Sequence, residues 1–471
     1  MTRHTALVSA LLLSACAAVP GAKLADVKPV AYQADQAFAA TPAAWPGDHW
    51  WQAYNDPQLD ALIEEGLSGA PNIAAAKGRL EKARSLADSA RADLLPSLDA
   101  NGQVATKKQS LNEGFPPQFA QYLPEGYHGF GEVTLNLNWE LDFWGKNRKA
   151  LAAAISETRA SDADLAEARL VLSTGIAAAY ADLARLYAER DVAERAVASR
   201  QETLNLVQRR VTNGLDTHGE LSQAQAGPAS ARADLEAIDE EIALTRNEIA
   251  ALMGEGPDRG VAMVRPKDAS LKTFGLPQRL AADLLGRRPD IAAARWRAEA
   301  AAKRIGVAKA QFYPDVNLSA LIGYQTLGLS KLFQSSSNIG QVGPAVSLPI
   351  FEGGALRANL KGARADYETA VASYDQTLTE ALHEVADATA SERALGSRLK
   401  ESSDALAADE DAYRIARLRY EGGLSNYQSV LLAEDAVLTG RRTVVDLKAR
   451  AFTLDVQLVR ALGGGYQTSV N

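Results

Sequence analysis

Two segments of the chain alternate between apolar and polar residues, and a very long proline-free stretch follows each of them. The first segment is VTLNLNWELDF at 133–143, and the second is VSLPIFEGG at 346–354. Alternation with a period of two places the apolar side chains on one face of a strand and the polar ones on the other. We therefore expect strands with one face suited to lipid and one suited to water, each joined directly to a long helix.

The two halves of the chain repeat the same order of elements. Pro71-Asn72-Ile73 corresponds to Pro289-Asp290-Ile291, 218 positions later. Proline suits the first turn of a helix, so each triplet is expected to open a helix that ends before Pro96 or Pro314. Alternation resumes after both prolines, which predicts β-hairpins at about 97–143 and 315–351. Strands of ten residues or so are long enough to cross a membrane when tilted.

The proline-free stretches predict long helices at about 146–211 and 354–420. At about 1.5 Å per residue, each spans about 100 Å. Return helices are expected at about 215–253 and 424–462. In the second copy, Val371, Leu378 and Val385 recur every seven residues, which is typical of a coiled-coil seam. This period alone fits a plain coiled-coil stalk equally well.

The predicted domain boundaries follow from these elements. They are a signal peptide at 1–15, an N-terminal tail and collar segment at 16–57, a first repeat at 58–257, a connector at 258–279, a second repeat at 280–464 and a flexible tail at 465–471.

The N-terminus resembles the leader of a bacterial lipoprotein. A short apolar run ends in Leu13-Ser14-Ala15-Cys16, and Cys16 is the only cysteine in the chain. This resemblance implies cleavage before Cys16 and a covalent diacylglycerol and N-acyl chain on that residue, with no other cofactor. The non-acidic Ala17 implies transfer to the outer membrane. The alternative is an ordinary signal peptide with an incidental cysteine.

Composition narrows the function classes. The chain has 50 basic and 58 acidic residues and a net charge of -8, which argues against a nucleic-acid partner. No apolar run of about 18 residues follows the leader, so no helix is expected to cross the inner membrane. Four strands cannot close a barrel, and open sheet edges are unfavourable in lipid. Closure of a barrel therefore requires several chains, and three copies would supply twelve strands.

Five motifs carry a resemblance to a known family. They are WWQAYNDPQLDALI (50–63), LLGRRPDIAAAR (284–295), FYPDVNLSA (312–320), LPIFEGGALRA (348–358) and RYEGGLSNYQSVLLAE (419–434). With them the chain resembles the TolC/OprM-type outer membrane efflux proteins, in particular the NodT-like lipoprotein branch. The resemblance covers nearly the whole mature chain.

The resemblance implies an α+β membrane protein. Its fold is a trimeric 12-stranded outer-membrane β-barrel, with four strands per chain, continuous with a long periplasmic α-helical barrel and built from two internal repeats. It implies partnership with a periplasmic adaptor and an inner-membrane pump of the resistance–nodulation–division type. The protein would then sit in the outer-membrane lipid of a Gram-negative bacterium and extend into the periplasm.

Residues with catalytic or metal-binding chemistry are sparse. The five histidines form no HExxH pair, and neither a phosphate-binding loop nor an EF-hand loop is present. His383-Glu384 is the pair closest to a metal motif, but a solvated or packed helix face explains it better. We expect no enzyme activity and no metal site.

Function is expected at the two helix reversals. Asparagine and glycine tolerate the positive φ that a tight turn needs. The resemblance implies adaptor docking at these tips, and a leucine beside each glycine also serves as a helix-capping contact. The tip residues are Val211, Gly214, Leu215, Gly423 and Leu424.

Related proteins often carry a ring of aspartates at a closed periplasmic aperture. The corresponding position here is Leu432, with Glu434 and Asp435 close after it. Either an apolar ring at Leu432 closes the aperture by excluding water, or Glu434 supplies the charge.

The sequence thus predicts a passive outer-membrane exit duct of a tripartite efflux system for small toxic compounds or drugs. One alternative keeps the duct but changes the cargo to metal ions or to proteins in type I secretion. A second alternative is a structural coiled-coil lipoprotein, for which the alternating strands have no use.

Overall fold

The computed structural model describes residues 38, 41–110, 122, 124–267, 275–277 and 280–467. The predicted signal peptide at 1–15 and Cys16 lie outside these described residues, as do parts of the predicted N-terminal tail and connector. Within the described residues, no helix is both long enough and apolar enough to cross a membrane.

The chain forms two compact units, and both repeats contribute to each of them. Unit 1 takes its described residues from Leu80–Ala160 and Ala294–Ser373. Unit 2 draws on Pro29–Arg79, Ser161–Ala293 and Tyr374–Asn471. The duplicated segments therefore interleave rather than forming one unit per repeat.

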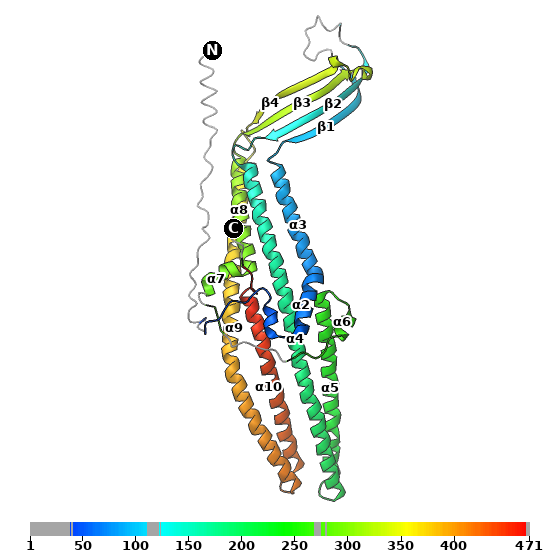
Figure 1. The fold of residues 1–471 in the computed structure, drawn as a ribbon, viewed down its shortest axis with the longest axis vertical. Coiled ribbons are helices and arrows are strands. Elements are labelled where there is room, and N and C mark those ends of the chain that lie inside the picture. The colour runs from blue at the N-terminus through cyan, green and yellow to red at the C-terminus, as the bar shows by residue number, and fades with distance from the viewer. Residues whose placement is uncertain are drawn as a thin grey trace. The chain divides into compact units, whose positions relative to one another are not determined.

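Unit 1 contains a four-stranded antiparallel sheet in the order β1-β2-β3-β4 (Figure 1). The strands are β1 (Ser97–Lys108), β2 (Tyr127–Glu140), β3 (Asp315–Leu327) and β4 (Asn338–Ser347). They are 10 to 14 residues long. The two hairpins join through β2 and β3, so that strands from both repeats make one sheet.

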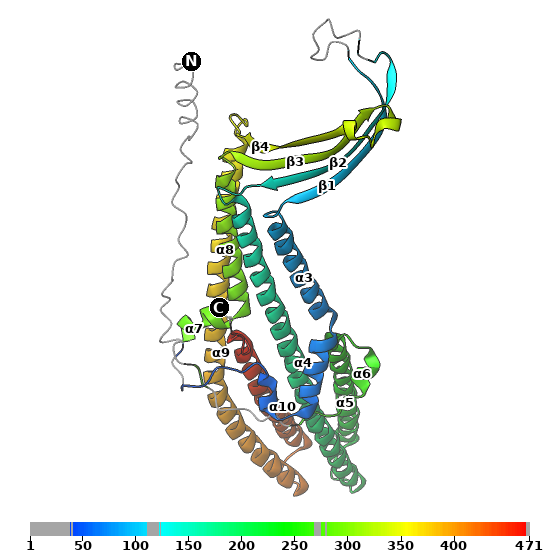
Figure 2. The same cartoon turned by 45° about the horizontal axis from the view of Figure 1, so that its top comes forward.

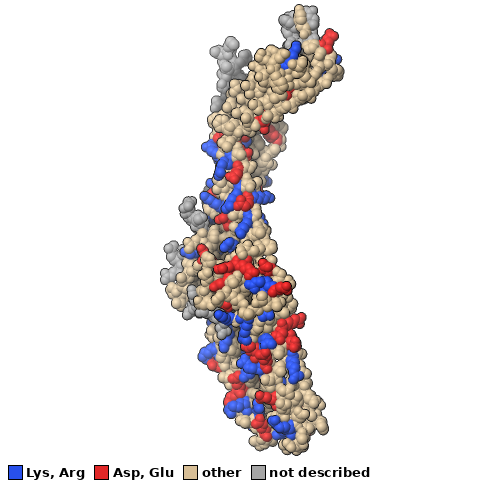
Figure 3. All heavy atoms as spheres, turned by 45° about the vertical axis from the view of Figure 1, so that its right-hand side comes forward, with Lys and Arg blue, Asp and Glu red and all other residues tan. Residues whose placement is uncertain are grey.

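The register gives the sheet one apolar and one polar face. One row of directly paired residues crosses the sheet from β1 to β4. It consists of Leu98, Leu137, Ala320 and Val342. Period-two alternation then places Val133, Leu135 and Ile322 on this face as well. In Figure 3 the sheet surface is almost free of Lys, Arg, Asp and Glu, whereas these side chains cover the helices. This arrangement is the one predicted from the alternating segments.

Four helices each have one end in unit 1, and that end is joined to a strand of the sheet through a short segment. These ends come from two helices that precede a strand and two that follow one. They belong to α3 (Pro71–Ala92), α4 (Lys146–Thr212), α8 (Pro289–Ala310) and α9 (Ala355–Glu421). Small side chains let α8 and α9 approach closely, and their core contains Ala298, Ala301, Ile305, Leu360, Tyr367 and Val371. Lys146 Nζ, at the start of α4, lies 2.7 Å from Glu140 Oε1 on β2.

Unit 2 is helical. Its further elements are η1 (Trp50–Tyr54), α2 (Pro57–Gly69), α5 (His218–Met253), α6 (Pro257–Val261), α7 (Leu280–Arg287) and α10 (Tyr427–Ala461) (Figure 2). Its main core packs η1 and α2 against α4, α5 and α10 and includes Trp50, Leu62, Tyr180, Met253 and Phe452. The short 3-10 helices η3 (Leu329–Lys331) and η4 (Ser335–Ser337) belong to unit 1, in the loop between β3 and β4.

Corresponding elements of the two repeats have nearly equal lengths. Helices α3 and α8 each have 22 residues, and α4 and α9 each have 67. The return helices α5 and α10 have 36 and 35 residues. The side chains of Val371, Leu378 and Val385 are buried, as the seven-residue spacing predicts. The duplication seen in the sequence is therefore present in the structure.

Several boundaries differ from the prediction for identifiable reasons. Strand β4 ends at Ser347 because this residue pairs with Asp315, the first residue of β3, so that β3 offers no partner to the residues after it. Helices α5 and α10 begin at His218 and Tyr427, since the tip residues before them are needed for the turn and the N-cap. The flexible tail predicted from residue 465 is wrong for its first two residues. Gly465 is buried, and Tyr466 packs against Ala163, Ala292 and Ala293.

Candidate functional site

The first helix reversal is a compact glycine turn between α4 and α5. Gly214 has a φ of +73°, a backbone conformation that favours glycine. The amide of Leu215 donates a 2.9 Å hydrogen bond to the carbonyl of Arg210, which closes the end of α4. Thr217 caps α5 in a capping box with Glu220. These bonds fix the backbone, and the Leu215 side chain remains 64% exposed.

The second reversal, between α9 and α10, repeats this geometry. Gly423 has a φ of +72°, and the amide of Leu424 donates a 2.7 Å hydrogen bond to the carbonyl of Arg419. The side chain of Asn426 caps α10 by accepting a hydrogen bond from the amide of Ser429. The Leu424 side chain is 73% exposed. Each tip therefore presents one apolar side chain on a rigid turn.

An apolar cluster from all four helices supports the two tips. It contains Val207, Ala224, Tyr420, Tyr427 and Val430, which are buried. Val211 packs against this cluster, so its role differs from that of the exposed leucines. Val211 thus packs inward, whereas the exposed side chains of Leu215 and Leu424 are free to contact another molecule.

Arg210 connects the two tips. Its Nε donates a 3.0 Å hydrogen bond to Asp216 Oδ2, and its Nη1 donates one of 3.3 Å to the carbonyl of Glu421 on the other tip. The guanidinium lies over the ring of Tyr420, 4.4 Å from the ring centroid. The Tyr420 hydroxyl also donates to Asp216. The hydrogen bond that Arg210 donates to Asp216 raises the pKa of Arg210.

The sequence analysis did not identify this Arg210–Asp216–Tyr420 group. Arg210 and Tyr420 are 210 positions apart, and only packing brings them together. One signal was present, because an arginine precedes the glycine turn in both copies as Arg210 and Arg419. Sequence alone does not tell which of the two faces the other tip.

The predicted aperture residues on α10 point in different directions. Leu432 is 62% exposed, whereas Glu434 is 1% exposed. Two residues subtend about 200° on a helix, so these side chains lie on nearly opposite faces. Asp435 is exposed and forms an ion pair with Arg200 on α4. Of the candidates, Leu432 and Asp435 therefore reach the surface in this structure.

Glu434 is held inside unit 2. Its Oε1 accepts a 2.7 Å hydrogen bond from the hydroxyl of Ser199, and its Oε2 lies 3.3 Å from Arg200 Nη1 without a hydrogen bond of its own. Burial raises the pKa of Glu434. A solvent-facing ring of Glu434 carboxylates, one of the two predicted forms of the aperture, does not agree with this placement.

Arg288, in the LLGRRPDIAAAR motif, joins three helices of unit 2. Its Nη1 donates hydrogen bonds of 2.6 Å to Glu384 on α9 and 3.0 Å to the carbonyl of Ala461 at the end of α10. Its Nη2 donates to Asp290 Oδ2 at 2.6 Å. Burial lowers the pKa of Arg288, but these carboxylates outweigh that effect and raise it overall. The motif therefore has a structural explanation.

Glu167 on α4 faces the same group of charges. Burial, the largest cause, raises its pKa to about 7, and Asp290 adds to this shift. Arg288 and Arg460 act in the opposite direction. Glu167 is thus a carboxyl group that titrates near neutral pH inside the helical unit.

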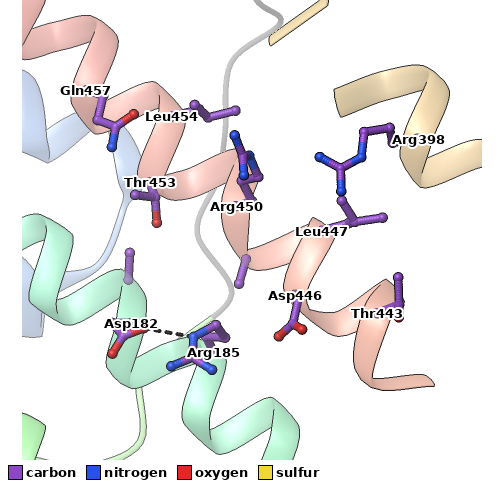
Figure 4. A pocket seen from close by; sticks show the side chains of 12 residues that line it. Asp182, Arg185, Arg398, Thr443, Asp446, Leu447, Arg450, Thr453, Leu454 and Gln457 are labelled. Carbon is purple, nitrogen blue, oxygen red and sulfur yellow. Dashed lines mark hydrogen bonds and ion pairs between the residues drawn. The ribbon is translucent and has the colours of Figure 1, made fainter. Parts of the chain in front are cut away.

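A polar cavity of about 440 Å³ lies between α4, α9 and α10. In Figure 4, Arg398 of α9 and Arg450 of α10 point toward one another across it, and Arg185 contacts Asp182. The Arg185 Nε donates to Asp182 Oδ1 at 2.8 Å. The lining contains no histidine or cysteine, so the cavity offers no general base of the imidazole type and no thiol nucleophile.

The side chains of His383 and Glu384, which are adjacent in the sequence, have different partners. Glu384 turns to Arg288, while His383 Nε2 lies 3.4 Å from Asp387 Oδ2 on the exposed side of α9. Among the described residues, no group of three or more His, Cys, Asp or Glu is arranged to hold a metal ion.

Comparisons with known proteins agree with this architecture. The family described as "Outer membrane efflux protein" matches residues 62–255 and 280–464. The multidrug resistance outer membrane protein MdtP of Escherichia coli K12 is 32% identical over 466 residues, which are 98% of this chain and 95% of that protein. The fusaric acid resistance protein FusA of Burkholderia cepacia is 36% identical over 371 residues, which are 76% of this chain and 68% of FusA.

A solved structure has the same fold. The outer membrane protein VceC of Vibrio cholerae superimposes with a TM-score of 0.85 at 45% identity, and the match covers 90% of this chain and 100% of VceC. Similarity at this level extends to both units and both repeats.

Proposed function

The chain belongs to the outer membrane efflux protein family, and from this membership we propose that it is the exit duct of a tripartite efflux system. The protein resides in the outer membrane, extends into the periplasm and conducts small toxic compounds to the exterior. The energy for transport comes from an inner-membrane pump, because the duct itself is passive. The family is one of efflux ducts, and we propose that this chain catalyses no reaction.

One observation carries the proposal, the two-faced sheet joined directly to long helices. Its apolar face suits lipid, and its polar face suits a water-filled interior. Within the part of the chain that the structure describes, strands β1 and β4 each pair with a single strand, so both leave backbone groups unpaired at the sheet edges. Such edges are unfavourable in a bilayer, and a homotrimer would remove them by closing a twelve-stranded barrel.

The tips are the proposed contact with a periplasmic adaptor. Leu215 and Leu424 are apolar, exposed and held on rigid turns, which are properties of residues that bind a partner at low entropic cost. The flanking Gly214 and Gly423 set the turns, and Val211 supports them from within. The proposed pump is of the resistance–nodulation–division type, in keeping with the resemblance of the chain to the lipoprotein branch.

Leu432 is the proposed constriction residue. It is the exposed apolar side chain at the predicted position, whereas Glu434 is internal. An apolar ring closes a channel by excluding water, and a passive duct needs such a closed state to protect the periplasm. Asp435 adds exposed charge close by.

Membrane anchoring through Cys16 is a further part of the proposal. A diacylglycerol and an N-acyl chain on Cys16 would attach the chain to the outer membrane independently of the sheet, since several acyl chains anchor stably. Cys16 lies outside the described residues, so the proposal rests on the sequence 13–16 alone.

The names of two relatives favour small compounds as cargo over metal ions or proteins. MdtP is called a multidrug resistance protein, and FusA a fusaric acid resistance protein. A structural coiled-coil lipoprotein would not need an amphipathic sheet.

The proposed function is tested by accumulation of a fluorescent drug in a host strain that lacks its own outer-membrane efflux protein. Co-expression of this chain with its pump and adaptor is expected to lower the accumulated dye several-fold. A variant carrying charged residues at apolar sheet positions, Leu135→Asp with Ile322→Asp, is expected not to insert and not to transport. Equal dye levels with and without the wild-type chain, at matched membrane levels, would contradict the proposal.

A further inference from the structure

All four connections between the sheet and its helices lie at one end of the sheet. The antiparallel register places the start of β1, the end of β2, the start of β3 and the end of β4 side by side, since Ser97 pairs with Asn138 and Asp315 with Ser347. These four junctions, residues 93–96, 141–145, 311–314 and 348–354, all belong to unit 1. They therefore form one continuous edge below the apolar face.

Each junction exposes an apolar or aromatic side chain. Ile350 and Phe351 are 90% and 88% exposed, and Leu95, Phe143 and Tyr313 are exposed to a lesser degree. The ring of Trp144 stacks on that of Tyr313 with centroids 4.7 Å apart. The Trp144 Nε1 also donates a 2.8 Å hydrogen bond to the carbonyl of Pro314. Aromatic rings at such a boundary are typical of the membrane–water interface.

Cations are in excess directly beyond this aromatic edge. The junctions and the two helical turns next to them contain eight lysines and arginines but four carboxylates. The cations are Arg91, Lys146, Arg148, Lys149, Arg304, Lys309, Arg357 and Lys361, and the carboxylates are Asp88, Asp93, Asp142 and Glu352.

Half of the cations are already paired with carboxylates. Arg91 pairs with Asp88, Arg148 with Asp142, Lys146 with Glu140, and Arg304 with Glu157. Among the described residues, Lys149, Lys309, Arg357 and Lys361 form no ion pair. Asp93 and Glu352 are the unpaired carboxylates of the same edge, and Asp315 at the start of β3 shares Lys146 with Glu140. With these carboxylates and Glu157 included, the edge keeps a net excess of one positive charge.

Two of the unpaired lysines are positioned together. The stem of Lys149 runs along α8 at Gly306, where an added Cβ would lie 2.6 Å from Lys149 Cδ. Its Nζ donates a 3.3 Å hydrogen bond to the carbonyl of Trp144. Lys309 follows Gly306 by one turn of the same helix. The Lys149 ammonium group therefore lies next to the stacked Trp144–Tyr313 pair. Lys309 is four residues before Tyr313 in the chain, and Arg357 and Lys361 follow Phe351 on α9.

From this layering we propose that the junction edge binds the anionic headgroups of phospholipids in the periplasmic leaflet of the outer membrane. The proposal rests on the proposed function, because it requires the apolar face to lie in a bilayer. The lipid acyl chains would contact the apolar face, and the aromatic residues would lie at the depth of the lipid ester carbonyls. The four cations without an ion pair would contact the lipid phosphates. Continuity with the apolar face favours a lipid over a soluble acidic partner, because the junctions that carry the cations begin directly at the strand ends.

The test uses quenching of tryptophan fluorescence in reconstituted vesicles. The wild-type protein is placed in phosphatidylethanolamine vesicles that contain either brominated phosphatidylglycerol or brominated phosphatidylethanolamine. Bromine quenches nearby indoles such as Trp139 and Trp144. We expect about two- to five-fold preferential quenching by phosphatidylglycerol, which falls as ionic strength rises because exposed charges are screened.

Matched variants assign the preference to this edge. The variant K149Q/K309Q/R357Q/K361Q is expected to quench equally with both lipids. The control K77Q/R79Q/K82Q/K448Q removes the same charge from α3 and α10 outside the junctions and is expected to keep the wild-type preference. The half variants K149Q/K309Q and R357Q/K361Q are expected to show a preference between that of the wild-type protein and that of the fourfold variant. They replace the fourfold variant in the test if it does not fold.

Each contrary result has a distinct meaning. Quenching by both lipids without preference in the wild-type protein overturns the lipid proposal and leaves the duct intact. Loss of the preference in the control variant overturns it too, since net charge would then explain the effect. Abolition by inorganic phosphate at matched ionic strength would assign the cations to free phosphate instead of lipid. Absence of quenching by either lipid would contradict membrane insertion, and with it the proposed function.

Discussion

The hydroxyl of Ser199 on α4 donates a 2.7 Å hydrogen bond to Glu434 Oε1 on α10. This bond, with the nearby Arg200, turns the only carboxylate of the VLLAE segment toward the interior of unit 2. Leu432, two residues earlier on α10, consequently lies on the opposite face of this helix and is exposed. The Ser199–Glu434 contact thus decides which side chain of the segment is free to line an aperture.

Glu434→Gln is predicted to leave the ion selectivity of the closed duct unchanged. The amide can still accept from Ser199, whereas the ion pair with Arg200 is lost, so the main effect should be on stability. Reversal potentials in planar bilayers under a salt gradient provide the measurement. A clear fall in cation selectivity would show that Glu434 reaches the conduction path after all.

Leu432→Asp is predicted to raise the single-channel conductance. Three carboxylates around one axis would repel each other and recruit water where an apolar ring excludes it. Leu432→Met is the matched control and should retain the closed state. Unchanged conductance in the aspartate variant would place the constriction at other residues.

The secondary structure was largely predictable because it depends on local patterns. Period-two alternation identified the strands, and the absence of proline identified α4 and α9 to within one residue of their ends. Both tips were found because Gly214 and Gly423 supply a positive φ that other residues rarely adopt.

The contacts within the candidate site were not predictable in the same way. The orientation of Glu434 depends on how α10 packs against α4, and Arg210 meets Tyr420 only through the approach of two separate hairpins. The end of β4 was misjudged because Ile350 continues the alternation, whereas the partner strand β3 begins only at Asp315, opposite Ser347. In each case the outcome depends on the neighbouring element and not on the local pattern.

The tip leucines are predicted to be required for docking but not for folding. Leu215→Asp with Leu424→Asp replaces exposed apolar surface by charge, which should abolish crosslinking to the adaptor and drug efflux. The trimer should persist, because neither side chain is buried. Leu215→Met with Leu424→Met keeps the apolar surface and should dock normally. Undiminished crosslinking in the aspartate pair would move the docking site elsewhere.

Arg210→Ala is predicted to loosen both tips. It leaves the nearly buried Asp216 carboxylate without its cation, and removal of one partner of such a pair costs about 3 kcal/mol. Hydrogen exchange of the amides in 211–217 and 420–426 should speed up together, while exchange in the sheet stays unchanged. Tyr420→Phe removes one hydrogen bond and should have a smaller effect of about 1 kcal/mol. Acceleration at the first tip alone would mean that Arg210 does not couple the two turns.

Cys16→Ser is predicted to abolish acylation and leave insertion of the sheet intact, since the apolar face does not depend on the N-terminus. Incorporation of labelled palmitate into wild-type and variant protein is the measurement. A serine variant that still takes up the label would rule out Cys16 as the acylated residue.

The carboxyl of Glu167 is predicted to make stability depend on pH. Burial raises its pKa to about 7 in the folded chain, against about 4.3 for an ordinary glutamate. Between these values the folded state binds more protons than the unfolded state, so the free energy of unfolding must fall as the pH rises from about 4.5 to about 7. Glu167→Gln stays neutral throughout and should remove this part of the slope, with a gain of up to about 3.5 kcal/mol at pH 8.

Chemical denaturation of the solubilised protein at pH 5 and pH 8 tests this linkage. The wild-type chain should lose stability between the two values by more than the Glu167→Gln variant does. Glu241→Gln changes an exposed carboxylate on α5 and should leave the wild-type slope in place, because water already solvates that charge. Parallel pH profiles for the wild-type protein and the Glu167→Gln variant would mean that Arg288 and Arg460 offset the burial of Glu167 fully, and that its carboxyl is ionised across this range.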